Sequence, residues 1–189
     1  HHYDLDFLKV MNDYFYPPPP GLESLKTAED LRQLRLLDVE KTDWKEQFKA
    51  LTTIAARLKG RAYFIDTVFD PWQSIRRSMA GETMPTLMRD APEALLSALD
   101  IVADNLVAYC KKSLSLGSAG IFMSVAAASE ILARDQFLTF VKPFALKVFE
   151  AIAPYGKMNT AHIHGRDLFF DAVLDFPVHV FNWWDRGPN

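Results

Sequence analysis

Apolar and polar residues follow two different periods along the chain, and each change of period marks a new element. From residue 42 to residue 59 apolar side chains recur every three or four positions, which predicts an amphipathic helix that Gly60 ends. A run rich in β-branched and aromatic residues follows at 61–69 and predicts a strand. Upstream of both, Thr27 has the character of a helix cap and predicts a short helix.

The same alternation continues to the end of the chain. Pro92 begins a long apolar-striped helix that Gly117 ends. A helix from Asp135 contains Pro143, which predicts a kink or a break there. The other elements expected in this half are strands at 120–128, 157–164 and 178–183 and a short helix at 166–175.

Strands therefore alternate with helices, and this order predicts a parallel sheet with its helices packed outside it. No Gly-x-Gly-x-x-Gly follows any strand, which disfavours a dinucleotide-binding fold. The predicted class is an α/β protein of the (β/α)8 TIM-barrel type. A full barrel needs about 250 residues, so we expect an incomplete one, with about half to two-thirds of the strands, in a single domain of residues 1–189. A short apolar stretch at 4–11 would supply a fifth strand.

Composition narrows the class of partner. The chain has 24 acidic and 21 basic residues and a formal net charge of −3, which argues against nucleic acid as the main partner. No apolar run approaches the roughly 20 residues of a membrane helix, so no membrane partner is expected. The one cysteine, Cys110, falls on the apolar stripe of the long helix and is interpreted as a small buried hydrophobe. A lone cysteine fits a reducing compartment, and a cytoplasmic location is expected.

The most informative local pattern is His162-Ile-His164 at the end of a predicted strand. Side chains two residues apart on a strand share a face, and in parallel α/β folds the carboxyl ends of the strands carry the active site. Two imidazoles at this spacing can hold one divalent metal such as zinc. The alternative is a hydrogen-bonded polar pair at the barrel mouth. A third ligand is not identifiable from the sequence; the candidates are Asp66, Asp70, Asp185 and His179.

Other polar residues interrupt apolar segments. Asp66 either points into the barrel as a substrate or proton-transfer group or forms an ordinary salt bridge. Arg76 and Arg77 follow a Pro-Trp turn and suit carboxylates if they face the mouth; otherwise they are solvated helix surface. Trp183, beside a second tryptophan, either lines a pocket or packs in the core, and core packing is the expectation.

Several of these segments, taken together, resemble the uroporphyrinogen decarboxylase superfamily. Phe-Leu-Thr-Phe-Val-Lys-Pro-Phe at 137–144, the strand ending His-Ile-His-Gly at 162–165, and Val-His-Val-Phe-Asn-Trp at 178–183 occur in the order expected of that superfamily. The Asp-Pro-Trp turn at 70–72 and the Asp-Phe-Leu-Lys run at 6–9 resemble its earlier segments. The resemblance spans nearly the whole chain.

This resemblance implies an (α/β)8 barrel with its pocket at the carboxyl ends of the strands. The name-giving members remove acetate carboxyl groups from uroporphyrinogen III in porphyrin biosynthesis and need no metal or cofactor. The resemblance also implies an Asp that holds the pyrrole nitrogens, for which Asp6 is the nearest match, and Arg residues that bind substrate carboxylates. The leading expectation is therefore a carboxy-lyase, decarboxylase-like, acting on a tetrapyrrole or a related small molecule.

The resemblance also assigns individual positions. Arg77 stands where the family has a tyrosine after the Pro-Trp turn, and the substrate-contacting serine aligns with Ser124 or, two residues later, with Ala126. Asn182 stands where a later strand of the family has an aspartate before its tryptophan. The expected catalytic residues are Asp6 and Asp66, and the expected substrate-binding residues are Trp72, Arg76, Arg77, Ser124, His162, Asn182 and Trp183.

Two alternatives remain open. Related members of the superfamily are corrinoid-dependent methyltransferases, in which His-x-Cys and a later Cys bind a zinc ion that activates a thiol; here His162 and His164 would be zinc ligands. The chain would alternatively be a truncated, catalytically silent fragment. A partial parallel barrel has unpaired strand edges, so in that case we expect the chain to pair with a second copy as a homo-oligomer, to cover the edges with its own termini, or to be only marginally stable.

Overall fold

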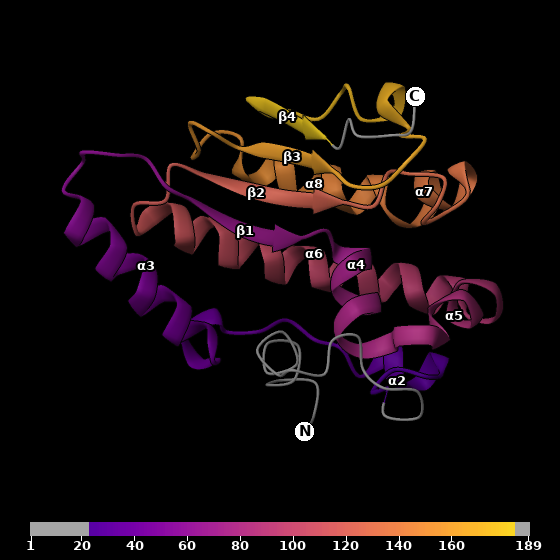
Figure 1. Cartoon of the computed structure of the whole chain (residues 1–189). Helices are drawn as coiled ribbons and strands as arrows, with labels where there is room; N and C mark the ends of the chain where they lie inside the picture. The colour runs from indigo at the N-terminus through magenta and orange to yellow at the C-terminus, as the bar shows by residue number, and fades with distance from the viewer. Residues whose placement is uncertain (1–22, 184–189) are drawn as a thin grey trace.

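The computed structural model describes residues 23–183, so Asp6 and the strand expected at 4–11 lie outside the described residues. Within them the strands form one parallel sheet in the order β1-β2-β3-β4 (Figure 1). The bounds of the strands are β1 Ile65–Phe69, β2 Gly120–Val125, β3 Thr160–Ile163 and β4 Val180–Trp183. Sequential neighbours joined by crossovers are the topology of a TIM-barrel segment, as predicted.

Helices connect the strands and cover one face of the sheet, with α6 and α8 packed beside each other behind it in Figure 1. The α-helices are α2 Ala28–Arg32, α3 Trp44–Leu58, α4 Pro71–Ile75, α5 Met84–Asp90, α6 Pro92–Ser115, α7 Arg134–Phe140 and α8 Lys142–Ile152. Shorter turns are the 3-10 segments η1 Val39–Lys41, η3 Gly81–Thr83 and η4 Phe170–Ala172 and the π-helix η2 Arg76–Ala80.

The helix boundaries follow the signals in the sequence. Thr27 caps α2 in a reciprocal capping box with Asp30. Pro92 occupies the first turn of α6, where its missing N–H costs nothing. The helix expected from Asp135 is broken at Val141, which ends α7 and caps α8, because Pro143 cannot continue the hydrogen-bond ladder. The predicted break is confirmed.

The prediction of a short helix at 166–175 is wrong, since only the 3-10 turn η4 forms there. The backbone of this segment bonds to the loop after β2 instead: Phe169 N–H donates to the Ala127 carbonyl at 2.9 Å, and Ser129 N–H donates to the Asp167 carbonyl at 3.2 Å. Tertiary pairing has therefore replaced local helical bonding. The helical segments between Pro71 and Asp90 were not predicted either.

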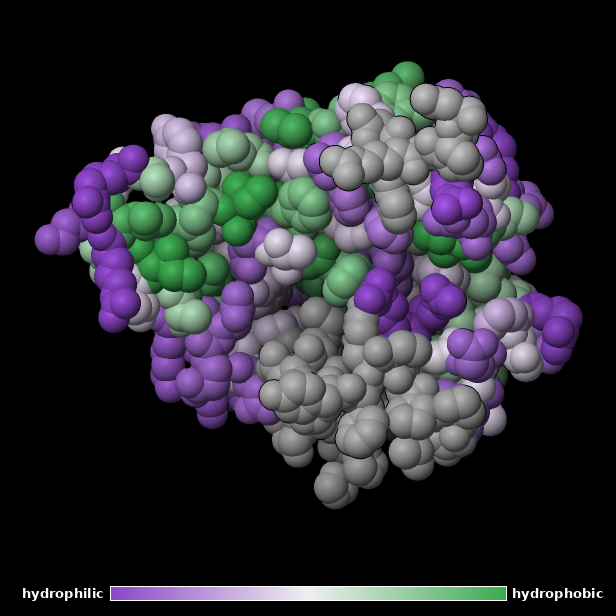
Figure 2. All heavy atoms as spheres, viewed as in Figure 1, coloured by the Kyte–Doolittle hydropathy of each residue, from purple (hydrophilic) through white to green (hydrophobic). Residues whose placement is uncertain are grey.

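The two faces of the sheet differ. Buried side chains alternate along β1, so Asp66 and Val68 point toward the helices while Thr67 and Phe69 point away from them. Ile121 and Met123 of β2 and Ala161 and Ile163 of β3 are fully buried and complete the apolar layer against α6 and α8. The face away from the helices is the one that the interior of a barrel would use. In the same view as Figure 1, apolar surface gathers over the amino-terminal part of β1 and β2 (Figure 2).

Candidate functional site

A single row of side chains crosses all four strands on the face away from the helices. Register pairs Phe69 with Ser124, Ser124 with His162, and His162 with Asn182. Because paired residues of neighbouring strands share a face, these four side chains lie beside one another near the carboxyl ends of the strands. We call Phe69, Ser124, His162 and Asn182 the cross-strand row. Sequence reasoning left Ser124 and Ala126 as alternatives, and the register places Ser124 in the row.

His162 is the central group of this row. Its Nδ1 lies 2.6 Å from the Asn182 Oδ1, and its half-buried ring stacks on Phe122 with centroids 5.1 Å apart. The amide oxygen only accepts, so Nδ1 carries a hydrogen and Nε2 is the nitrogen left for a ligand. The ring of His164 lies 5.7 Å from that of His162, and His164 is exposed. The two imidazoles therefore share a face, as their spacing predicts.

The arginine pair borders the row at β1. The guanidinium carbon of Arg77 lies 4.4 Å from the centroid of the Phe69 ring, and that of Arg76 lies 5.5 Å from the Trp72 centroid. Arg77 is half-buried, and this burial lowers the pKa of its guanidinium. Arg77 therefore brings positive charge to the β1 end of the row.

A buried carboxylate fixes the ends of β1 and β2, and sequence reasoning considered it only as a possible metal ligand. Asp70 has no solvent exposure; it accepts from the backbone N–H of Gln73 at 2.8 Å and of Ala126 at 2.9 Å. The Gln73 side-chain amide donates to Asp70 and to the Ser124 carbonyl, both at 2.9 Å. Desolvation raises the pKa of Asp70 to about 6. The signal available in the sequence was Asp-Pro-Trp-Gln, the pattern of a helix N-cap with its third-residue partner.

Asp66 does not join the row, so it neither points into the barrel interior nor supplies a third metal ligand beside the imidazole pair. It is buried on the helix side of β1, where it accepts hydrogen bonds from the hydroxyls of Tyr109 at 2.7 Å and Ser113 at 2.8 Å, both on α6. The backbone N–H of Thr67 donates to it at 2.9 Å. The alternative of a salt bridge to an arginine is also not found for Asp66 among the described residues. Asp66 is therefore a structural acceptor that joins the sheet to α6.

The two expected tryptophans also lie away from the row. Trp72 is 2% exposed in the core, so its ring presents no surface to a substrate. Trp183 pairs with Ile163, which points toward the helix side, and it packs edge-on against Phe170 with centroids 5.4 Å apart. Trp183 is 49% exposed, so the expectation that it packs in the core is wrong.

Cys110 is buried as expected, and burial raises the pKa of its thiol.

The metal hypothesis was tested against the donor atoms present. Catalytic zinc takes three protein ligands from His, Cys, Asp or Glu. Within residues 23–183 no group of three such side chains could hold a metal ion. The imidazole pair therefore supplies two ligands without a third from this part of the chain.

Among residues 23–183 no helix has the length and apolar character needed to cross a bilayer.

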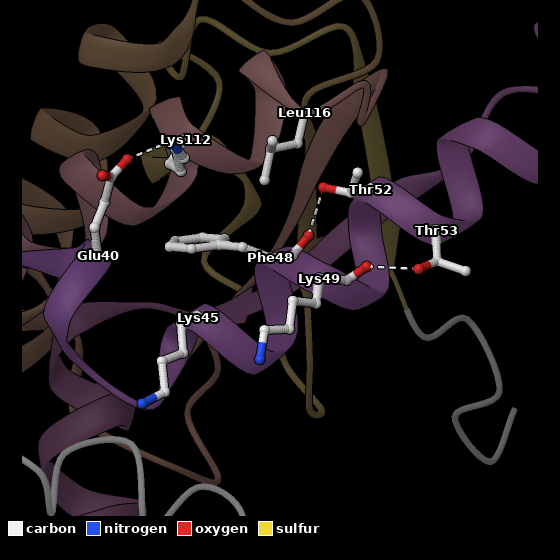
Figure 3. A pocket seen from close by; sticks show the side chains of 8 residues that line it. All are labelled: Glu40, Lys45, Phe48, Lys49, Thr52, Thr53, Lys112 and Leu116. Carbon is white, nitrogen blue, oxygen red and sulfur yellow. Dashed lines mark hydrogen bonds and ion pairs between the residues drawn. The ribbon is translucent and has the colours of Figure 1, made fainter.

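A hollow separate from the cross-strand row lies on the helix side, between α3 and α6 (Figure 3). It has a volume of about 510 Å³ and is lined by Glu40, Lys45, Phe48, Lys49, Thr52, Thr53, Lys112 and Leu116. Lys112 pairs with Glu40, and Lys49 pairs with Glu46 at 2.8 Å, so much of the lysine charge is already offset. Both threonine hydroxyls donate to carbonyls of α3. This hollow shares no residue with the cross-strand row.

Comparison with known proteins identifies relatives of the chain. The sequence matches the profile of the uroporphyrinogen decarboxylase family over residues 16–185. Among solved structures, a methyltransferase from Methanosarcina mazei superposes with a TM-score of 0.59 at 16% sequence identity. The match covers 84% of this chain and 43% of the methyltransferase, so the chain spans less than half of that protein's length. The likeness confirms the predicted fold type, with an incomplete barrel in the described residues. No curated protein matches the chain.

Proposed function

The chain belongs to the uroporphyrinogen decarboxylase family, and from this premise we propose that the cross-strand row binds a carboxylated tetrapyrrole or a related small molecule for decarboxylation. The observation that carries the proposal is the register that places Ser124, His162 and Asn182 side by side at the carboxyl ends of β2, β3 and β4. This is the edge at which parallel α/β barrels bind their substrates. Because the match covers only 43% of the structural neighbour, decarboxylation by the whole protein is itself part of this proposal.

The row offers groups that suit such a ligand. His162 presents Nε2 as a proton acceptor or, when charged, as a donor to a carboxylate, and Asn182 fixes the orientation of its ring. The flat rings of Phe122 and Phe69 lie on the same face and offer apolar contact to a macrocycle. When CO2 leaves an acetate side chain, the remaining carbon takes up one proton. Among the described residues of the row, His162 in its charged form is the group that can hold that proton. The role of Asp6 toward the pyrrole nitrogens stays a prediction.

Binding of uroporphyrin by the purified chain tests this proposal, with fluorescence titration as the readout. We expect His162→Ala to weaken binding at least tenfold, on the order of one lost charge-assisted hydrogen bond. His179→Ala is the matched control, because His179 is exposed and precedes β4, at the opposite end of the strands. Equal affinity of the two variants would reject the site. Conversion of uroporphyrinogen to coproporphyrinogen, followed by chromatography, then tests the reaction itself.

A zinc-dependent methyltransferase is the second candidate. Two observations favour it: the imidazoles of His162 and His164 lie 5.7 Å apart, and His162 Nδ1 is held by an amide oxygen, as metal-ligating histidines usually are. The structural neighbour is also named as a methyltransferase. The described residues lack a third ligand, so no step through zinc is derived. Metal analysis decides: one zinc per chain that is lost in His164→Ala but kept in His179→Ala supports this candidate, and a zinc-free chain after dialysis against zinc removes it.

A further inference from the structure

An amide side chain from α4 reaches the cross-strand row. α4 begins where β1 ends, and its third residue is Gln73, which is buried (Figure 1). The Gln73 Nε2 lies 2.9 Å from the Ser124 carbonyl oxygen and 3.4 Å from the Ser124 Oγ. Gln73 therefore contacts both the backbone and the side chain of a residue of the row.

Asp70 fixes the direction in which the Gln73 amide points. Its carboxylate is fully buried and accepts from the Gln73 Nε2 at 2.9 Å. The ionised Asp70 carboxylate and the Ser124 carbonyl both accept hydrogen bonds and have none to donate. The nitrogen of the amide must therefore face them, so the chemistry of the neighbours assigns its orientation. The backbone N–H groups of Gln73 and Ala126 donate to Asp70 at 2.8 and 2.9 Å and hold the carboxylate in place.

This arrangement decides which role the Ser124 hydroxyl is left to play. A hydroxyl has one hydrogen to donate and two lone pairs that accept. The Gln73 amide donates to the Ser124 Oγ and so uses a lone pair. Among residues 23–183 the hydroxyl hydrogen has no acceptor. That hydrogen is therefore left for a ligand, on the face away from the helices and beside His162.

We propose that Gln73, oriented by Asp70, is a positioning residue that presents the Ser124 hydroxyl to the cross-strand row as a hydrogen-bond donor. The ligand group that meets Ser124 is then an acceptor, such as a carboxylate oxygen, and not a donor, such as a pyrrole N–H. This choice of ligand group rests on the proposed function, whereas the orientation of the Ser124 hydroxyl does not.

Gln73→Met tests the orientation, because methionine is also unbranched but has no hydrogen to donate. The variant strands neither acceptor: the Ser124 carbonyl still accepts from the Asp70 N–H at 2.9 Å, and the Asp70 carboxylate keeps its backbone donors. The matched control is Gln47→Met. Gln47 also donates to a buried carboxylate, that of Asp66, but on the helix side of the sheet, at 3.4 Å.

Nuclear magnetic resonance of the full chain without ligand gives the χ1 rotamer of Ser124 from three-bond couplings. We expect one rotamer in the wild type and in Gln47→Met, and averaging between rotamers in Gln73→Met. Averaging already in the wild type, or an unchanged single rotamer in Gln73→Met, overturns the proposal. Gln73→Leu carries the same expectation and replaces Gln73→Met if urea unfolding shows that the methionine variant is not folded.

Uroporphyrin affinity, read by fluorescence, measures what the orientation contributes to binding. We expect Gln73→Met and Ser124→Ala each to weaken binding several-fold, while Gln47→Met binds like the wild type. The double variant should bind like Ser124→Ala alone, because Gln73 acts through the hydroxyl. Losses that add in the double variant overturn the positioning role. A chain that does not bind uroporphyrin, yet loses its single Ser124 rotamer in Gln73→Met, keeps the positioning role and rejects the proposed function instead.

Discussion

Replacement of Asp66 tests most sharply whether this carboxylate is structural or catalytic. Tyr109 and Ser113 donate to it from α6 at 2.7 and 2.8 Å, and Thr67 N–H donates at 2.9 Å, all in a buried environment. Asp66→Ala leaves two buried hydroxyls without their acceptor. At about 1–3 kcal/mol for each stranded group, the expected loss of unfolding free energy is roughly 2–6 kcal/mol. That is a large part of the 5–15 kcal/mol that typically stabilises a domain.

Urea unfolding followed by tryptophan fluorescence measures this loss, and Trp44, with its ring centroid 4.9 Å from that of Tyr109, reports on the region directly. Tyr109→Phe alone should cost about 1.5–3 kcal/mol, the range for a hydrogen bond to a charged group. In the Asp66→Ala background the same change should cost much less, because the hydroxyl has already lost its acceptor. Uroporphyrin affinity, measured well below the unfolding transition, should not change. An Asp66→Ala protein of normal stability that no longer binds uroporphyrin would refute the reasoning.

Three further changes give expected outcomes that stability measurements can check. Gly120→Ala should destabilise the fold severely, since its Cβ would lie 2.3 Å from the Met158 backbone, whereas Gly60→Ala meets no atom within 4 Å and should cost about 1 kcal/mol for its positive φ. Asn105→Ala should cost about 2–3 kcal/mol, because the Asn105 side-chain oxygen accepts from Leu37 N–H at 2.8 Å and its side-chain nitrogen donates to the backbone carbonyl at position 35 at 3.0 Å. Burial raises the pKa of Asp70 from 3.8 to about 6, so the folded chain binds this proton more tightly than the unfolded one. Its contribution to unfolding free energy should therefore fall by about 2 kcal/mol between pH 4 and pH 6.5, seen as the pH-dependent difference between wild type and Asp70→Asn; a difference that rises with pH would contradict this sign.

The sequence alone predicted most of the fold because the strong signals were local. Helical spacing and Pro92 predicted α6, and Pro143 predicted the break before α8. The Thr27 cap predicted the start of α2. The segment 166–175 failed because long-range backbone bonds to the loop after β2 outweighed local helix formation. The π-helix η2 has no sequence signature that distinguishes it from an ordinary helical turn.

The site was predictable in its members but not in its arrangement. Spacing placed His162 and His164 on one face, yet only the register between strands brings Ser124 and Asn182 beside them. Asp66 was misplaced because both faces of a barrel strand are apolar, so alternation could not say which face is the interior. Tyr109 and Ser113, two hydroxyls four residues apart on the buried stripe of α6, were the signal that a polar partner lies on the helix side.

The central claim is that the face of the sheet away from the helices, at the carboxyl ends of its strands, holds the ligand. The most direct measurement is a nuclear magnetic resonance titration of histidine-labelled chain with uroporphyrin. The account predicts that the imidazole signals of His162 and His164 shift with one common affinity while that of His179, which precedes β4, stays in place. Shifts of His179 alone, or of all three equally, would contradict it.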